Sequence, residues 1–210
     1  MPRRARALAT ALALVVAGAG AGVYAGWSSG WLKRFDPTRR TVVFLGDSIT
    51  AGDGVSPEVT FPHRLGAALG VPARNAGISG DTTWGALKRL ETDVLAHRPK
   101  VVVVELGVND EVDYHRPAEQ TLRNLRQIAR RLRKDGARVV LVYTPFAEFD
   151  RELYREGLRA IARRERAGLV ETFYDGIVPK LTVDGLHPSS EGHAVLAARL
   201  EPVLREILGR

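Results

Sequence analysis

Five apolar runs alternate with five helical patterns along residues 41–208, and this alternation constrains the fold more than any other feature of the chain. The run Val101–Leu106 is dominated by β-branched residues, which is typical of a strand covered on both faces. Segments with helical periodicity separate the runs, so helices are expected to join consecutive strands. Strands that alternate with helices form a parallel sheet with helices on both faces. The sequence therefore predicts an α/β domain.

The patterns give approximate bounds for each element of this domain. The expected strands are Thr41–Leu45, Ala73–Asn75, Val101–Leu106, Arg138–Tyr143 and Leu169–Phe173. The expected helices are Phe61–Leu69, Thr82–His97, Pro117–Lys134, Asp150–Ala167 and Ser189–Leu208. With 210 residues, of which 45% are hydrophobic, the chain has enough apolar side chains for one such domain and a short additional segment.

Composition excludes several classes of function. The chain has no cysteine, so it holds no disulfide, iron–sulfur cluster or thiolate zinc site. Its formal charge of +7 lies mainly in residues 1–40, which carry seven basic residues and one acid, whereas the remainder is close to neutral. A nucleic-acid-binding domain carries a basic patch on its folded body, so no nucleic-acid partner is expected. The arginines of the two middle helices are interpreted as a solvated face interleaved with glutamates.

The N-terminal segment has the pattern of an export signal or a membrane anchor. The basic stretch Pro2–Arg6 precedes the charge-free stretch Leu8–Gly26, which approaches the roughly 20 residues needed to span a bilayer. Trp27 and Trp31 match interfacial anchors and favour a tether through residues 8–27. The small-residue triplet at residues 19–21 instead fits a cleavage site.

These patterns divide the chain into three parts. Residues 1–31 are expected to be a signal peptide or membrane anchor, residues 32–40 a linker, and residues 41–210 the folded domain. Both alternatives for the N-terminus export the domain: it is either anchored to a membrane outside the cytoplasm or secreted after cleavage.

Four polar segments lie where the carboxyl ends of the expected strands meet. Three follow the first, second and third strands, and the fourth lies between the last strand and the last helix: Gly46-Asp47-Ser48, Gly77-Ile78-Ser79-Gly80-Asp81, Gly107-Val108-Asn109-Asp110 and Asp184-Gly185-Leu186-His187. In open α/β sheets, ligands bind outside the carboxyl ends of the strands. The four segments are therefore expected to form one site.

Ser48, His187 and Asp184 are the residue types of an acyl-transfer site. A serine hydroxyl is too weak an acid to react alone and needs a general base within about 3 Å, a role that His187 fits. Asp184, three residues before His187, can fix the tautomer of the ring and stabilise the imidazolium. Activity should fall at acid pH, where a protonated His187 cannot accept the serine proton.

Three donors are expected to form an oxyanion hole: the backbone N–H groups of Ser48 and Gly80 and the side-chain amide of Asn109. Gly80 has no Cβ, so its N–H can approach a substrate closely. Loss of one such donor typically costs about 2.7–4 kcal/mol of barrier lowering. Asp47 is interpreted as a residue that orients the turn through a local hydrogen bond. The other histidines lack metal-ligand spacing and are interpreted as surface or capping residues: His63, His97, His115 and His193.

The four segments resemble the sequence blocks of the GDSL, or SGNH, hydrolases. The likeness covers about residues 41–208 and is greatest to bacterial acylhydrolases of the thioesterase I, lysophospholipase L1 and arylesterase type. Such a resemblance implies a flavodoxin-like three-layer α/β/α sandwich whose five-stranded parallel sheet has the order 2-1-3-4-5. It also implies Ser48 as nucleophile, the Asp184/His187 pair as the rest of a triad, Gly80 and Asn109 in the oxyanion hole, and no metal or cofactor. Val108 departs from the subgroup, which often has a second glycine there.

The expected function is that of a serine esterase, an acylhydrolase of the lysophospholipase type that cleaves carboxylic esters or thioesters of a small or lipid substrate. One alternative within the enzymes is a carbohydrate deacetylase of the cell envelope that uses the same site. The other alternative is a catalytically silent envelope-binding module. The intact set of catalytic residues argues against that module.

Overall fold

The computed structural model describes residues 38–144 and 151–209, so the expected signal or anchor and most of the expected linker lie outside the described residues. Thr38–Arg210 forms a compact unit that contains the whole sheet and both hydrophobic cores. This unit therefore carries the elements that a domain needs to fold by itself. Within the described ranges, no helix is both long enough and apolar enough to cross a bilayer.

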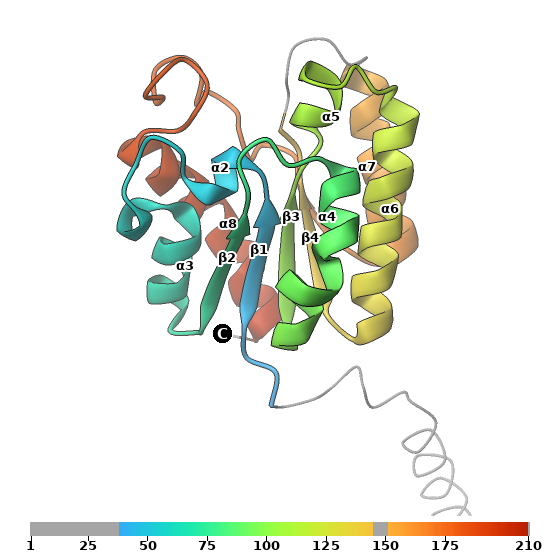
Figure 1. Cartoon of the computed structure of the whole chain (residues 1–210). Coiled ribbons are helices and arrows are strands. Elements are labelled where there is room, and N and C mark those ends of the chain that lie inside the picture. The colour runs from blue at the N-terminus through green and yellow to red at the C-terminus, as the bar shows by residue number, and fades with distance from the viewer. Residues whose placement is uncertain (1–37, 145–150, 210) are drawn as a thin grey trace, which may run out of the picture. The chain divides into compact units, whose positions relative to one another are not determined.

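A five-stranded parallel sheet forms the middle layer of this unit. The strand order is β2-β1-β3-β4-β5, which confirms the expected order 2-1-3-4-5. The strands are β1 (Val42–Gly46), β2 (Ala73–Gly77), β3 (Val101–Glu105), β4 (Arg138–Val142) and β5 (Gly168–Val170). Their carboxyl ends lie at one edge of the sheet, at the top in Figure 1.

Helices cover both faces of the sheet, as expected for a three-layer α/β fold (Figure 1). One face packs against α3 (Phe61–Leu69) and α8 (Ser190–Leu208). The other face packs against α4 (Thr83–Arg89), α6 (Ala118–Asp135) and α7 (Arg151–Glu165). Short helices lie in the connections after two of the strands: α2 (Ser48–Ala51) and η2 (Pro57–Val59) after β1, and α5 (Val108–Val112) after β3.

Alternation along the central strands divides the apolar residues between two cores. In β1, Val42 and Phe44 face α3 and α8, whereas Val43 and Leu45 face the three helices of the other layer. All four side chains are buried, because a parallel sheet covered on both faces has no solvated side. The apolar runs in the sequence therefore correspond to the two faces of one sheet.

Two expected elements differ in the structure. The helix predicted over Thr82–His97 is α4 followed by a π-helical turn, η3 (Leu90–Val94), and a 3-10 turn, η4 (Leu95–His97). The wider π turn keeps both Leu90 and Val94 fully buried, and Arg98 then ends the helix in the left-handed region at φ 46°. The strand predicted over Leu169–Phe173 ends at Val170, and the apolar Phe173 fills the core from a turn.

His193, in the first turn of α8, caps the N-terminus of α3. Its Nδ1 accepts a hydrogen bond from the Phe61 N–H at 3.2 Å, and the two rings stack with centroids 5.9 Å apart. The side chain is fully buried, and burial lowers the pKa of His193 to about 4. His193 is thus one of the expected capping residues, and the other three histidines are exposed: His63, His97 and His115.

Protonation of His193 should destabilise the domain in acid. Because its folded pKa lies below the ordinary value of about 6.5, the unfolded chain binds the proton first, and stability is lost as the pH falls from about 6.5 to about 4. In His193→Asn, the Oδ1 atom can still accept the Phe61 N–H but does not titrate. Urea unfolding at both ends of this window should show that wild type loses about 2–3 kcal/mol more unfolding free energy than the variant. Equal losses would contradict this account.

Candidate active site

Ser48 begins α2 directly after β1, at the carboxyl edge of the sheet (Figure 1). Asp47 caps this short helix, because its Oδ1 accepts a hydrogen bond from the Ile49 N–H at 3.0 Å. Gly46 permits the tight passage from strand to helix, since a Cβ at this position would collide with the side chain of Thr50. The local hydrogen bond predicted for Asp47 is therefore present, and it fixes the turn that presents Ser48.

His187 links Ser48 to Asp184. Its Nε2 lies 2.9 Å from the Oγ of Ser48, and its Nδ1 lies 2.6 Å from Oδ2 of Asp184. The second oxygen of Asp184 accepts the backbone N–H groups of Leu186 at 2.9 Å and His187 at 2.7 Å. The hydrogen bond from the His187 ring, with these two backbone bonds, holds the pKa of Asp184 well below its usual range. Asp184 therefore stays charged beside the imidazole.

The segment that carries His187 is held by its own hydrogen bonds. It runs between β5 and α8 and contains turns and a single antiparallel bridge between Thr182 and Pro188. The Val183 N–H donates to the His187 carbonyl at 2.8 Å, and the buried Tyr174 hydroxyl donates to the Leu186 carbonyl. These bonds close a loop around Asp184 and His187, so both side chains come from one small hydrogen-bonded turn.

Gly80 lies in the loop that joins β2 to α4. Its φ of 74° is in the left-handed region that favours glycine, and a Cβ built on it would meet no atom within 4 Å. The space beside Gly80 is therefore open on the side of the loop where a side chain would stand. The Asp81 N–H donates to the Ile78 carbonyl at 3.0 Å and closes the turn that contains Gly80.

Asn109 lies in α5, directly after β3, and connects the other two loops. Its Nδ2 donates to the Asp81 carbonyl at 2.9 Å and approaches Oδ2 of Asp47 at 3.4 Å. Asp81 follows Gly80, and Asp47 precedes Ser48. The structure thus brings the three residues predicted for the oxyanion hole to neighbouring positions at the same edge of the sheet.

A buried pair of carboxyl groups, Asp47 and Glu105, lies beneath this site. Burial raises the pKa of Asp47 well above its usual value, and the neighbouring charge of Glu105 adds to the rise. Burial also raises the pKa of Glu105, against the lowering effect of hydrogen bonds from Thr50, Asp47 and Thr144. We therefore assign the shared proton to Asp47, which donates it to the carboxylate of Glu105.

The sequence prediction assigned no role in the site to Glu105, Arg89 or Asp110. Arg89 donates to Oδ2 of Asp81 at 2.7 Å and to the Gly46 carbonyl at 3.2 Å, so it joins the first two loops. Asp110 is fully buried and accepts the backbone N–H of Thr83 at 2.7 Å, which fixes the start of α4 beside the Gly80 loop. Glu105 could have been found from the sequence, because an acid inside an apolar strand indicates a buried carboxyl group. Arg89 could not, because its sequence context is that of an ordinary surface arginine.

The chemistry available at this edge comes from the hydroxyl of Ser48, the imidazole of His187 and the carboxylate of Asp184. In the part of the chain that the structure describes, no three histidine, aspartate or glutamate side chains are grouped to hold a metal ion. A hydroxyl bonded to an imidazole that is in turn bonded to a carboxylate is the arrangement that serine hydrolases use on several unrelated folds.

Comparison with known proteins agrees with the fold and identifies related hydrolases. A GDSL-like lipase/acylhydrolase family model matches residues 44–195. The chain is 32% identical to the esterase TesA of Pseudomonas aeruginosa over 80% of this chain and 90% of that protein. It is 31% identical to thioesterase 1/protease 1/lysophospholipase L1 of Escherichia coli K12 over 75% of this chain and 79% of that protein. A crystal structure of TesA superposes with a TM-score of 0.73 at 30% identity, covering 80% of this chain and 99% of TesA.

The fold and the site, together with these relatives, define a serine ester hydrolase. Its parallel sheet of order 2-1-3-4-5 and its flanking helices are those of the SGNH hydrolases. The chain belongs to the GDSL-like lipase/acylhydrolase family, as the resemblance of its four segments indicated.

Removal of the titrating group at Asp47 should stabilise the domain toward higher pH. An acid whose folded pKa is raised holds its proton more tightly in the folded state, so stability falls as the pH rises from the unfolded pKa toward the folded one. Asn at position 47 keeps an oxygen for the Ile49 N–H and a donor for Glu105 but does not titrate. Relative to wild type, the unfolding free energy of Asp47→Asn should therefore increase as the pH rises from about 4 to about 7. A difference that does not change with pH would refute the protonated state of Asp47.

Proposed function

We propose that Ser48, His187 and Asp184 form the catalytic triad of an acylhydrolase that cleaves carboxylic esters or thioesters. The observation that carries this proposal is the continuous chain of contacts from Ser48 Oγ to His187 Nε2 at 2.9 Å and from His187 Nδ1 to Asp184 Oδ2 at 2.6 Å. Both distances are within the range in which a proton passes between a nucleophile and its base.

Acylation begins when the Ser48 Oγ attacks the carbonyl carbon of the ester. A proton on Nδ1, held by the charged Asp184, leaves Nε2 of His187 free to take the hydroxyl proton. The carbonyl oxygen becomes an oxyanion as the new bond forms. The tetrahedral intermediate then collapses, the bond to the leaving alcohol or thiol breaks, and His187 Nε2 returns the proton to that leaving group.

The developing oxyanion is stabilised by the N–H groups of Ser48 and Gly80 and by the amide of Asn109. Asn109 donates one hydrogen to the Asp81 carbonyl at 2.9 Å, and its second hydrogen, which makes only a long contact of 3.4 Å with Oδ2 of Asp47, is the one assigned to the substrate oxygen. The proton on Asp47 supports this role, because a charged carboxylate next to Ser48 would oppose a negative charge on the substrate oxygen.

Deacylation repeats the sequence with water as the nucleophile. His187 Nε2 takes a proton from the water as its oxygen attacks the acyl carbon of the Ser48 ester. The same three donors hold the second oxyanion. When this intermediate collapses, the bond from the acyl carbon to Ser48 Oγ breaks and the serine regains its proton from His187, which releases the carboxylic acid.

Hydrolysis of p-nitrophenyl esters from acetyl to palmitoyl by residues 38–210 tests this proposal. Ser48→Ala removes the nucleophile and should lower kcat/KM at least about a thousandfold. Asp184→Asn keeps the shape but disturbs the tautomer of His187, and it should lower kcat at least about a hundredfold. Ser56→Ala, which removes an exposed serine from another loop, should leave the turnover unchanged.

The pattern of results separates the candidate functions. Activity that survives in Ser48→Ala would overturn the mechanism. No turnover by folded wild-type protein on any chain length would favour a silent binding module. A sharp preference for acetyl would favour the carbohydrate deacetylase, and turnover that extends to long acyl chains would support the lysophospholipase-like acylhydrolase.

We further propose that the enzyme works outside the cytoplasm, on the membrane or after secretion. The basic Pro2–Arg6 and the charge-free Leu8–Gly26 support this location, and the esterase domain itself does not depend on it. When the full chain is expressed in a bacterial host, its catalytic domain should be accessible to protease added outside the inner membrane. A domain that is fully protected until the inner membrane is lysed would show that it stays in the cytoplasm.

A further inference from the structure

The outward face of α6 carries a row of cations that we call the basic stripe: Arg123, Arg130 and Lys134. Together with Gln127 they follow the spacing i, i+4, i+7 and i+11, which places them on one face of the helix over about 17 Å. All are exposed. Among the described residues, no acid lies within ion-pair distance of the three cations.

The other arginines of α6 differ, because each faces an acid. Arg126 and Arg133 reach Glu165 of α7 at 3.8 and 3.1 Å, and Arg131 reaches Glu91 at 3.5 Å. The interpretation of a solvated face with interleaved glutamates therefore holds for the sides of α6 that meet its neighbours. It does not account for the basic stripe, whose charges have no such partners within the described residues.

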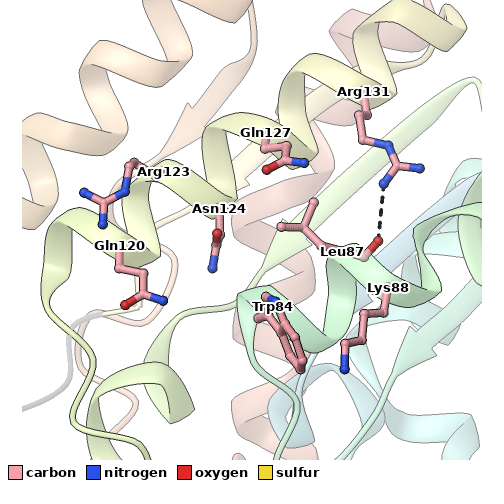
Figure 2. Close-up of a pocket in the computed structure, with 8 residues that line it drawn as sticks. All are labelled: Trp84, Leu87, Lys88, Gln120, Arg123, Asn124, Gln127 and Arg131. Atoms are coloured by element: carbon pink, nitrogen blue, oxygen red, sulfur yellow. Dashed lines mark hydrogen bonds between the residues drawn. The ribbon is translucent and has the colours of Figure 1, made fainter.

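A hollow of about 620 Å³ lies between α6 and α4 and includes Arg123 of the basic stripe (Figure 2). Arg123 lies at one end of this hollow, and Trp84 and Lys88 line its α4 side. Trp84 is 50% exposed, and the Lys88 Nζ lies over its ring, 3.2 Å from the centroid. Tryptophan beside lysine and arginine is the combination that proteins place at the boundary between water and lipid headgroups.

The basic stripe is not needed to build the fold. Arg130 and Lys134 are like charges one turn apart, which is destabilising on a helix, and no described acid forms an ion pair with either of them. The folded domain is close to neutral overall, so the three cations of the basic stripe, which form no ion pair with a described acid, are a local excess of positive charge on this face. Such segregation of charge attracts anionic partners and raises their rate of association.

This face adjoins the catalytic edge of the sheet. The α6 residue Asn124 donates to the Thr83 hydroxyl at 2.9 Å, and Thr83 in turn binds Asp110, the neighbour of Asn109. Trp84 is the next residue of α4. Other large apolar side chains are exposed in segments that follow β2 and β3 at the same edge of the sheet: Ile78, Val112 and Tyr114.

We propose that the basic stripe, with Lys88 and Trp84, docks the enzyme on an anionic phospholipid surface, from which the site takes an amphiphilic ester. This proposal rests on the proposed function, because it names the class of substrate that the same site would hydrolyse. Cations spread along a helix face suit an extended anionic surface better than one small ligand. The apolar side chains at the catalytic edge suit a bilayer better than a nucleic acid, whose recognition depends on a basic surface.

Trp84 offers a direct readout of this docking. The chain has three tryptophans, and Trp84 is the one within residues 38–210, since the others are Trp27 and Trp31. The tryptophan emission of residues 38–210 therefore reports on this face alone. Vesicles of phosphatidylcholine, with or without an equal part of phosphatidylglycerol, supply neutral and anionic surfaces.

The test compares two double variants with the same change in charge. Arg123→Glu/Arg130→Glu reverses two charges of the basic stripe. Arg40→Glu/Arg205→Glu reverses one exposed charge before β1 and one charge on α8, in the opposite helical layer. Sedimentation with vesicles, the emission of Trp84 and the turnover of a soluble p-nitrophenyl ester are measured for each protein.

Wild type and the Arg40→Glu/Arg205→Glu control should bind anionic vesicles, and binding should shift the Trp84 emission to shorter wavelength. Both proteins should dissociate from the vesicles when the salt concentration is raised. The stripe variant should bind at least about tenfold more weakly, with unchanged turnover of the soluble ester, because each cation near an anionic surface contributes separately. On phosphatidylcholine alone, all proteins should show little binding.

Equal binding to both kinds of vesicle, equal losses in both double variants, or an unchanged Trp84 emission would overturn the docking proposal. Retention on duplex DNA, with none on vesicles, would overturn it in favour of a nucleic acid. Ser48→Ala separates this proposal from the proposed function, since it should bind vesicles as wild type does while hydrolysing nothing. Esterase activity without vesicle binding would refute docking alone, and vesicle binding without esterase activity would refute the proposed function alone.

Discussion

The buried carboxylate of Glu105 is the interaction on which the geometry of the site depends. It lies at the end of the central strand β3 and accepts hydrogen bonds from the hydroxyls of Thr50 at 2.9 Å and Thr144 at 3.3 Å, and from Asp47. These partners follow β1 and β4, the two neighbours of β3. A buried carboxylate without partners costs several kcal/mol, so the segments after β1 and β4 are constrained to one arrangement against the end of β3. The position of Ser48 follows from this constraint, because it lies between Asp47 and Thr50.

This network also determines the electrostatics around the nucleophile. Two buried carboxyl groups in contact cannot both ionise at low cost, so one proton is retained, and the hydrogen bonds to Glu105 direct it to Asp47. Asp47, next to Ser48, is thereby neutral, and the negative charge resides on Glu105, where hydroxyl and backbone donors satisfy it. The oxyanion donors at the surface then act on a substrate without a competing carboxylate beside them. The Asp47–Glu105 pair therefore serves both the fold and the reaction: it satisfies the buried carboxylate at the end of β3, and it removes a negative charge from beside Ser48.

The sequence predicted the parts that depend on periodicity and on local chemistry. Apolar runs that alternate with helical patterns indicated the parallel sheet. The segments that follow its strands contain the residues that meet at the site. The strand order was predicted from the family resemblance and not from the apolar runs. The π turn at Leu90–Val94 was not predictable, because the same apolar spacing fits a regular helix, and packing decides between the two. Phe173 misled the prediction of the last strand, since a buried aromatic residue in a turn has the same local pattern as one in a strand. The interaction of Glu105 with Asp47 could not be predicted from the apolar pattern of the sequence, because it depends on the register between β1 and β3.

The two halves of the site are held by different physical means. Ser48 is fixed by a buried network at the centre of the sheet, so the order of the strands determines its position. His187 and Asp184 lie on a turn after the edge strand, held by bonds within the turn and by Tyr174. The Asp184 side chain is 50% exposed, whereas Asp47 is 1% exposed. A change in the His187 turn therefore displaces the base relative to the nucleophile without opening either core, whereas a change around Glu105 affects folding and catalysis together.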